Sequence, residues 1–203
     1  MRLVRLGLKR FFQAIALIIT FPAAALTLFG RIGPVYTFFA HSFAHGPGLP
    51  GSLLRAAYYK MTLRESSIDV TLALGTYFVQ PDTVLHEGVS IGAYCVIGRS
   101  SIGARSQIAS HVLIPSGRSQ HVRNADGTLS DGITAATAIG ADCWIGDGAV
   151  IMASLGDGVT VGAGSVVTRA VPAGTVVVGN PARPIERASG QDSAALEAVV
   201  RHS

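Results

Sequence analysis

An aliphatic residue, usually followed by glycine, recurs at intervals of six from about residue 84 onward. The unit is plain at 91–96 (IGAYCV), 102–107 (IGARSQ), 139–144 (IGADCW) and 145–150 (IGDGAV), with a few shorter intervals. A period of six indicates one short strand and one tight turn per unit, stacked as a parallel β-helix. We expect the leading aliphatic residues to form an inward apolar ladder. Three hexapeptides per coil then give a triangular prism. The glycine beside each one should let the turn bend where a Cβ would clash.

The repeat is interrupted once, over residues 120–138, and closes near residue 172. The polar interruption carries no aliphatic ladder and is predicted to be a loop that leaves one corner. Long loops in compact domains are often functional. Residues 172–186 are expected to leave the prism. We assign 68–186 to the repeat domain, 51–67 to a connector that is a short helix or extended, and 187–203 to a polar tail.

The N-terminal segment, residues 1–50, contains an uncharged apolar run at 11–29 and a second at 33–43, followed by a breaker at 46–51 (GPGLPG). The first run is about as long as a helix that crosses a bilayer core, roughly 20 residues. Pro22 is expected to break this run midway and to bend it. Both runs are predicted to be helical.

Several arrangements of this segment are open: a cleaved signal peptide, a single spanning helix with the body outside, and a re-entrant or interfacial segment. The helices could also pack on the body or on a sister subunit. We favour a cytoplasmic body held on the membrane by residues 1–45. The basic start would add attraction to anionic lipid headgroups. This interpretation predicts a location at the cytoplasmic face of the cell membrane.

Composition narrows the class of protein. The chain is 49% hydrophobic and 14% charged, which excludes intrinsic disorder, and its 24 glycines follow no collagen period. The formal charge of +4 resides in the first ten residues, where the cations are Arg2, Arg5, Lys9 and Arg10. The remaining body is neutral, which argues against a nucleic-acid partner. Cys95 and Cys143 lack CxxC spacing and indicate free thiols in a reducing compartment.

Longer motifs carry a family resemblance. Residues 137–152 (TAIGADCWIGDGAVIM), 161–172 (VGAGSVVTRAVP) and 177–185 (VVGNPARPI) resemble the hexapeptide acyltransferase superfamily, over about 68–186. Residues 115–121 (PSGRSQH) and 48–63 are similar to its bacterial polysaccharide-biosynthesis O-acyltransferase branch. The resemblance implies a left-handed β-helix and a homotrimer with active sites between prisms. It also implies acetyl-CoA or another acyl-CoA as co-substrate, with no metal.

Acyl transfer to a hydroxyl requires a base near the acceptor oxygen and a donor to the developing oxyanion. A neutral histidine suits the first task near pH 7. His121 opens the long loop, where the resembling enzymes place their catalytic histidine, and we predict that it is the general base. His86 and His111 lie inside hexapeptides, where exposure to solvent is expected.

The resemblance also implies the co-substrate groove, position by position. The matching residues are Asp147, Ala163, Thr168, Arg169 and Arg183. Ala163 would press its backbone on the pantetheine arm, and the arginines suit the nucleotide phosphates because guanidinium binds phosphate bidentately. The flanking residues Ser116, Arg118 and Gln120 are candidates for contact with the acceptor.

These features predict an O-acyltransferase that modifies a sugar hydroxyl in cell-surface polysaccharide or lipid-linked saccharide synthesis. Two alternatives stay open: an acetyltransferase for a soluble amino acid, sugar or antibiotic, and a non-catalytic membrane-tethered scaffold. A zinc carbonic anhydrase on the same architecture is disfavoured. The body histidines His86, His111 and His121 lack the tight pair that such a zinc site needs.

Overall fold

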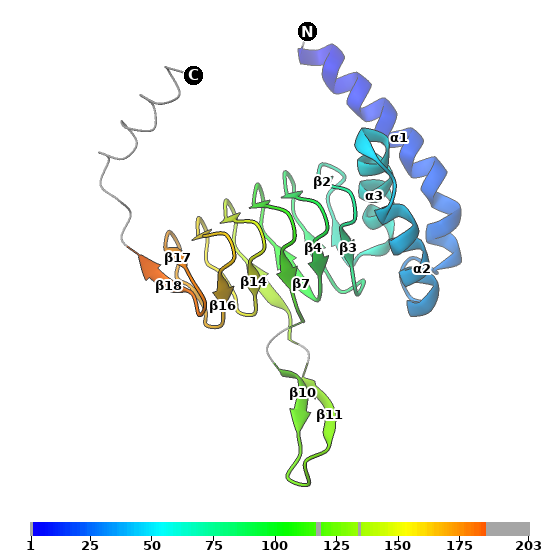
Figure 1. Cartoon of the computed structure of the whole chain (residues 1–203). Helices are drawn as coiled ribbons and strands as arrows, with labels where there is room; N and C mark the ends of the chain where they lie inside the picture. Colours follow the sequence, from blue (N-terminus) through cyan, green and yellow to red (C-terminus); the bar gives the residue numbers. More distant parts are fainter. Residues whose placement is uncertain (1, 117–118, 134, 186–203) are drawn as a thin grey trace, which may run out of the picture.

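The computed structural model describes residues 2–116, 119–133 and 135–185; of 2–6, 119–122 and 131–133 it describes the backbone alone. Within those residues three helices precede a stack of short strands (Figure 1). The helices are α1 (Arg2–Leu26), α2 (Gly33–Ala44) and α3 (Gly48–Thr62). The predicted tail, 187–203, lies outside the described residues.

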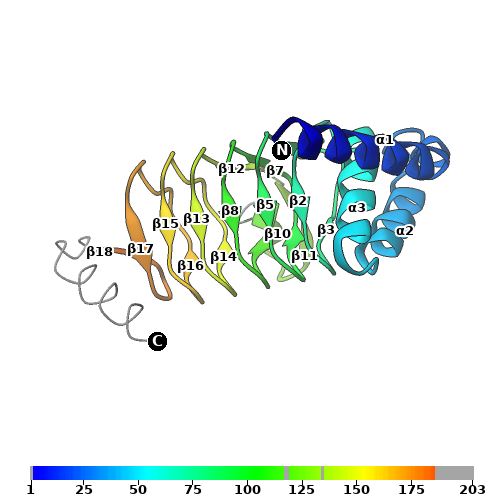
Figure 2. The same cartoon turned by 90° about the horizontal axis from the view of Figure 1, so that it is seen from above.

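Three parallel sheets form the sides of a prism (Figure 2). Sheet A consists of β1 (Glu65–Ser66), β4 (Val84–Leu85), β7 (Ser100–Ile102) and β12 (Thr137–Ile139), continued by single bridges at Leu155 and Val171. Sheet B consists of β2 (Thr71–Leu72), β5 (Ser90–Ile91), β8 (Gln107–Ile108), β13 (Trp144–Ile145), β15 (Thr160–Val161), β17 (Val176–Val178) and the antiparallel β18 (Arg183–Ile185). Sheet C consists of β3 (Tyr77–Phe78), β6 (Val96–Ile97), β9 (Leu113–Ile114), β14 (Val150–Ile151) and β16 (Val166–Val167).

Each coil visits sheets A, B and C in turn, and about six coils make a left-handed parallel β-helix. This confirms the predicted fold class. We name the prism edges by the sheets they join: the A–B, B–C and C–A corners.

The predicted ladder of aliphatic residues forms the core of the prism. Ile91, Ile108 and Ile145 lie in register on sheet B, and each is at most 3% exposed. The fifth residue of a unit is small and also faces inward, as Cys95 and Cys143 do. Both cysteines are free and buried, and burial raises the pKa of each thiol. Repetition of one apolar layer therefore builds the whole core.

Glycine has two roles in the repeat, at the second and at the fourth residue of the unit. A Cβ on Gly92 or Gly146 would lie 2.6 Å from the backbone of the next coil, so these glycines permit close stacking of coils. The bend itself falls at the fourth residue of the unit, where Gly148 and Gly164 have φ of 68° and 66°. The expected clash of a Cβ at the second residue is therefore confirmed, whereas the bend lies two residues later than expected.

Three segments differ from the sequence-based expectation. The first coil already begins at β1, because Ser66, Leu72 and Phe78 take the inward positions without an Ile-Gly signature. Residues 172–186 do not leave the prism at once, since Val171 and β17 continue sheets A and B. Helix α3 starts within the 46–51 breaker and fills most of the connector.

Helix α1 runs through Pro22 without interruption, contrary to prediction. The side chains around it explain this: Thr20, Ala23 and Ala24 are buried on both sides of the exposed proline. Because α1 packs along α3, these contacts hold the helix together where one backbone hydrogen bond is lost.

The helices are docked on the first coil through buried polar groups. The Arg55 guanidinium, 1% exposed, donates to the carbonyl oxygens of Leu72 (3.0 Å) and Gly46 (2.7 Å), among others. The Tyr59 ring packs edge-on against Phe78, with 4.7 Å between the ring centroids. Helix α3 therefore caps the N-terminal end of the prism and holds α1 and α2 against it.

Candidate functional site

A two-stranded hairpin, which we call the arm, leaves the prism at the C–A corner between the third and fourth coils (Figure 1). It consists of β10 (Ser119–Arg123) and β11 (Leu129–Ile133), and His121 pairs with Asp131 in the antiparallel register. The Asp126 carboxylate accepts a 2.9 Å hydrogen bond from the Thr128 N–H and closes the turn. The predicted loop is thus an ordered hairpin that carries the predicted base.

The root of the arm is fixed by Ser116. Its Oγ accepts a 2.9 Å hydrogen bond from the backbone N–H of Arg99, and its carbonyl oxygen accepts one of 3.2 Å from the Ala135 N–H. Ser116 is 5% exposed, so its hydroxyl has a structural partner where the arm begins.

Other predictions near the arm fall on residues that the structure does not describe. Arg118 and the side chains of Gln120 and His121 lie outside the described residues. The predicted role of His121 as base, and of Arg118 and Gln120 in acceptor binding, therefore stay predictions.

Asp147 and Ala163 occupy equivalent places at the B–C corner of the fourth and fifth coils, and both are exposed. The glycines that follow them, Gly148 and Gly164, face open space: a Cβ on either would meet nothing within 4 Å. In the fourth and fifth coils this corner is therefore a strip without large side chains. It could accommodate an extended chain lying against the backbone.

The Asp147 carboxylate has a structural partner. Its Oδ1 accepts a 2.9 Å hydrogen bond from the Ser110 N–H on the preceding coil. Asp157 does the same for the Ala141 N–H at the A–B corner, at 2.8 Å. The acid at this position is thus explained by coil stacking.

The remaining predicted groove residues lie elsewhere on the chain. Thr168 is half-buried and Arg169 exposed at the C–A corner of the fifth coil, and Arg183 is exposed on β18 at the C-terminal end of sheet B. A single chain therefore distributes the predicted groove over two corners and one end. It does not gather these residues in one pocket.

One feature of the B–C corner was missed by sequence reasoning. Tyr94 and His111 occupy the bend position of successive coils, with φ of 56° and 59°, and their rings stack with centroids 5.4 Å apart. The signal was available, because bulky residues replace the usual glycine there. His111 and His86 are exposed, which confirms the solvated role predicted for both.

Helix α1 has its small and polar residues inside and its large apolar residues outside. The buried face consists of Gln13, Ala16, Thr20, Ala23 and Ala24, and Thr27 directly after the helix is buried as well. The outer face exposes Leu8, Phe11, Phe12, Ile18, Ile19, Phe21 and Leu26, by 46% to 73%. By length and composition, Gly7–Leu26 could cross a membrane. An exposed apolar face of this extent marks an interaction surface.

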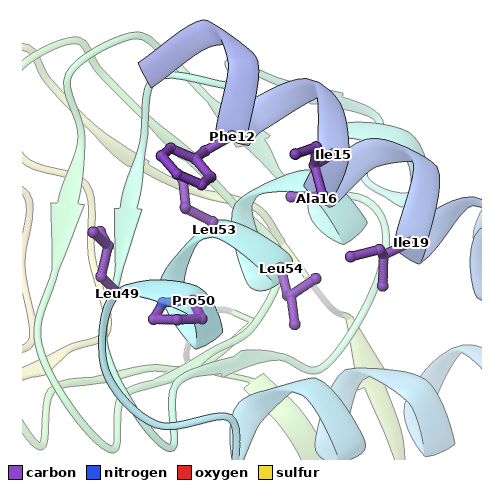
Figure 3. A pocket seen from close by; sticks show the side chains of 8 residues that line it. All are labelled: Phe12, Ile15, Ala16, Ile19, Leu49, Pro50, Leu53 and Leu54. Carbon is purple, nitrogen blue, oxygen red and sulfur yellow. The ribbon is translucent and has the colours of Figure 1, made fainter. Parts of the chain in front are cut away.

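An apolar groove of about 360 Å³ opens on this face between α1 and α3 (Figure 3). Phe12, Ile15 and Ile19 line it from α1, and Leu49 and Leu53 are among its residues on α3. Its lining is hydrocarbon almost throughout, so it suits an apolar occupant.

The basic end of α1 is clamped to the first coil at Asp69. Lys9 Nζ and Arg10 Nη2 each lie 2.9 Å from its carboxylate oxygens, and Gln13 Nε2 donates to the same group at 3.0 Å. The hydrogen bond from Lys9, then that from Gln13, lowers the pKa of Asp69 to about 2. The clamp fixes the direction of α1 relative to the prism.

Metal ligation has no candidate in the described part of the chain, where no three His, Cys, Asp or Glu side chains gather around one point.

The architecture is a left-handed parallel β-helix built on a six-residue repeat. A family model described as the hexapeptide repeat of succinyl-transferase matches residues 136–169. No curated protein matches the chain.

Two solved structures share the fold. One is a maltose O-acetyltransferase from Clostridium difficile 630, with 23% identity and a TM-score of 0.53, aligned over 82% of this chain and 91% of its own. The other is a galactoside acetyltransferase in complex with coenzyme A. It has 19% identity and a TM-score of 0.53, aligned over 79% of this chain and 82% of its own.

Proposed function

We propose that the protein is an O-acyltransferase that transfers an acyl group, most simply acetyl, from acyl-CoA to a hydroxyl of a saccharide in cell-surface polysaccharide or lipid-linked saccharide synthesis. The observation that carries this proposal is the arm, which positions the His121 backbone beside a repeat prism with a bare corner. The solved structures of similar fold are named for acetyl transfer to maltose and galactoside, which is the chemistry proposed here.

His121 acts as the general base in this mechanism. Its neutral imidazole removes the proton of the acceptor hydroxyl while that oxygen attacks the thioester carbonyl carbon. The C–S bond then breaks, the ester forms, and the proton passes to the departing CoA sulfur. No metal and no covalent enzyme intermediate takes part.

Acyl-CoA lies along the bare strip at the B–C corner. Ala163 presses against the pantetheine arm, since a larger side chain would fill the strip, and Asp147 borders it. Thr168 lies at the C–A corner and would reach the co-substrate from a neighbouring prism. Arg169 and Arg183 bind the nucleotide phosphates. Because one chain spreads these residues and His121 over separate edges, we propose a homotrimer in which neighbouring prisms complete each site.

The helices hold the enzyme on the cytoplasmic face of the cell membrane. The outer face of α1 and the groove of Figure 3 supply apolar surface for the lipid side. The clamp at Asp69 and the contact of α1 along α3 favour a helix that lies in one leaflet. A helix that crossed would carry α3 and the charged clamp into hydrocarbon, at high cost.

The test is acetyl transfer by the full-length protein in membranes or detergent. Radiolabelled acetyl-CoA is supplied with lipid-linked or free saccharide. Two quantities are measured: the alkali-labile label on the sugar, and the amount of free CoA thiol that is released. Saccharide-dependent release is the expected result. Transfer to an amino acid or antibiotic alone would favour the soluble-substrate alternative. The absence of transfer and of CoA binding would favour a scaffold.

A further inference from the structure

A second pocket, of about 550 Å³, lies where the α1–α2 turn meets the end of α3 and the C–A corner of the first coil. Arg31 from the turn and Arg64 from the end of α3 both line it. Within the described residues neither guanidinium has an ion-pair partner, and the one lining carboxylate, Asp82, is paired with Arg99 at 2.7 Å. The pocket therefore carries two uncompensated positive charges.

The two arginines sit on backbone segments that are packed tightly together. Gly30, with φ of 90°, precedes Arg31, and a Cβ there would overlap the Thr62 carbonyl oxygen. The Arg64 N–H donates a 2.7 Å hydrogen bond to the Pro81 carbonyl oxygen. Because both segments are held, the two side chains extend into the pocket from fixed backbone positions, and a pair of guanidiniums suits capture of an anion with several acceptor oxygens.

The surroundings of the pocket are apolar on the side of the α1–α2 turn. Phe29, which lines the pocket, is 49% exposed, and its neighbour Leu28 is 54% exposed. Leu26 and Ile32 extend this apolar surface along the chain. An anion pocket beside exposed hydrocarbon matches an amphiphile whose phosphate ends a long apolar chain.

A chain of contacts joins this pocket to the root of the arm. Asp82 lines the pocket and pairs with Arg99, whose N–H donates to Ser116 Oγ directly before the arm. The Nε of Arg99 is buried without a partner in the described structure, which leaves a donor free at this corner. A group attached to a phosphate in the pocket could therefore extend along the C–A corner toward His121.

We propose that Arg31 and Arg64 bind the phosphate of a saccharide acceptor that is linked through phosphate to a long hydrocarbon. This inference rests on the proposed acyltransferase function and names the class of its acceptor. The phosphate binds at the pocket, the hydrocarbon lies along Leu28 and Phe29, and the saccharide reaches the arm.

The first experiment measures binding without catalysis, by calorimetry on the full-length protein. The probes are dodecyl phosphate below its micelle concentration, dodecyl maltoside with the same chain, and inorganic phosphate. The double variant Arg31→Gln/Arg64→Gln should lose at least about tenfold in affinity for dodecyl phosphate. Its affinity for dodecyl maltoside should not change. The matched control is Arg105→Gln, an exposed arginine at the A–B corner, which should bind like the wild type.

Equal affinity of the double variant and the wild type for dodecyl phosphate would overturn the proposal. Inorganic phosphate that binds as tightly as dodecyl phosphate would overturn its lipid part and indicate a soluble phosphate ligand. Both arginines are exposed, so folding should persist, and the single variant Arg31→Gln repeats the test with a smaller change.

The second experiment separates this inference from the proposed function. With phosphate-linked lipid saccharide, the double variant should raise KM at least about tenfold, whereas KM for the free saccharide and kcat should stay unchanged. An equal rise in both KM values would contradict a phosphate role. If no saccharide is acylated while dodecyl phosphate binding still depends on both arginines, the acyltransferase proposal fails and the phosphate site stands.

Discussion

The backbone N–H of Arg99 donates a 2.9 Å hydrogen bond to the buried Oγ of Ser116, and this contact ties the second coil to the root of the arm. A Cβ on the neighbouring Gly98 would lie 2.6 Å from the same Oγ, so the corner is closely packed around it. The hydroxyl of Ser116 therefore contributes to holding the root of the arm against the second coil.

Replacement of Ser116 by alanine leaves the Arg99 N–H buried without that acceptor. We expect the free energy of unfolding to fall by about 1–3 kcal/mol, the usual cost of an unsatisfied buried donor. Urea unfolding measures this, with Ser101→Ala on the outer side of sheet A as the matched control. An effect no larger than the control's would show that the hydroxyl does not hold the root of the arm.

The clamp of α1 on Asp69 should be sensitive to acid. Folding lowers the pKa of the Asp69 carboxyl from 3.8 to about 2. The clamp therefore stabilises the folded state fully above pH 3.8, and this stabilisation is lost as the pH falls toward 2. Spin labels on the exposed residues Ile18 and Gln107 report the distance between α1 and sheet B. Its distribution should broaden only below about pH 4.

Asp69→Asn should broaden the same distance distribution at neutral pH, because the amide no longer pairs with Lys9 and Arg10. Glu87→Gln, an exposed acid without a described partner, serves as the control. A narrow distribution in Asp69→Asn would mean that apolar packing on α3 alone positions the helix.

Enlargement of Ala163 tests the bare strip at the B–C corner. Ala163→Leu adds an exposed side chain where pantetheine is proposed to lie, so we expect KM for acetyl-CoA to rise about tenfold or more with an unchanged melting temperature. Ala173→Leu occupies the equivalent exposed position at the A–B corner and should leave KM unchanged. The same KM in both variants would move the co-substrate away from this strip.

The two cysteines should be inert in the native protein. Cys95 and Cys143 are at most 1% exposed, and burial raises the pKa of both thiols, so little thiolate is present at neutral pH. Reaction with Ellman's reagent should therefore proceed only as fast as the protein unfolds. Rapid native-state reaction of either thiol would contradict the inward position of the fifth residue of each unit.

The sequence predicted the prism from the Ile-Gly period because one chemical pattern repeats wherever the ladder is aliphatic. The first coil is not predicted by this pattern. Its inward residues include Ser66 and Phe78, which are different residue types and do not continue the aliphatic repeat. The sequence predicts a loop at the arm because its two strands carry no aliphatic ladder and pair only with each other. Tyr94 stacks on His111 because the two residues lie at the same corner of successive coils. Which residues share a corner is known only after the register of the coils is known.

Individual residues of the candidate site can be predicted from the sequence, but their positions relative to one another cannot. The family resemblance points to His121, Ala163 and Arg183, yet only the fold shows that they lie on the arm, at the B–C corner and on β18. The sequence pattern does not predict the pocket proposed for phosphate, because Arg31 in the α1–α2 turn and Arg64 after α3 come together only in the folded chain.

The most direct test of the central claim is the rate of acetyl transfer by His121→Ala, measured with saturating acetyl-CoA and saccharide. His86→Ala and His111→Ala are the matched controls, as exposed histidines of the same domain. We predict that His121→Ala lowers kcat by a factor of about 10² to 10⁴ with the oligomeric state unchanged, whereas the controls keep wild-type rates. A wild-type rate in His121→Ala would contradict the proposed mechanism.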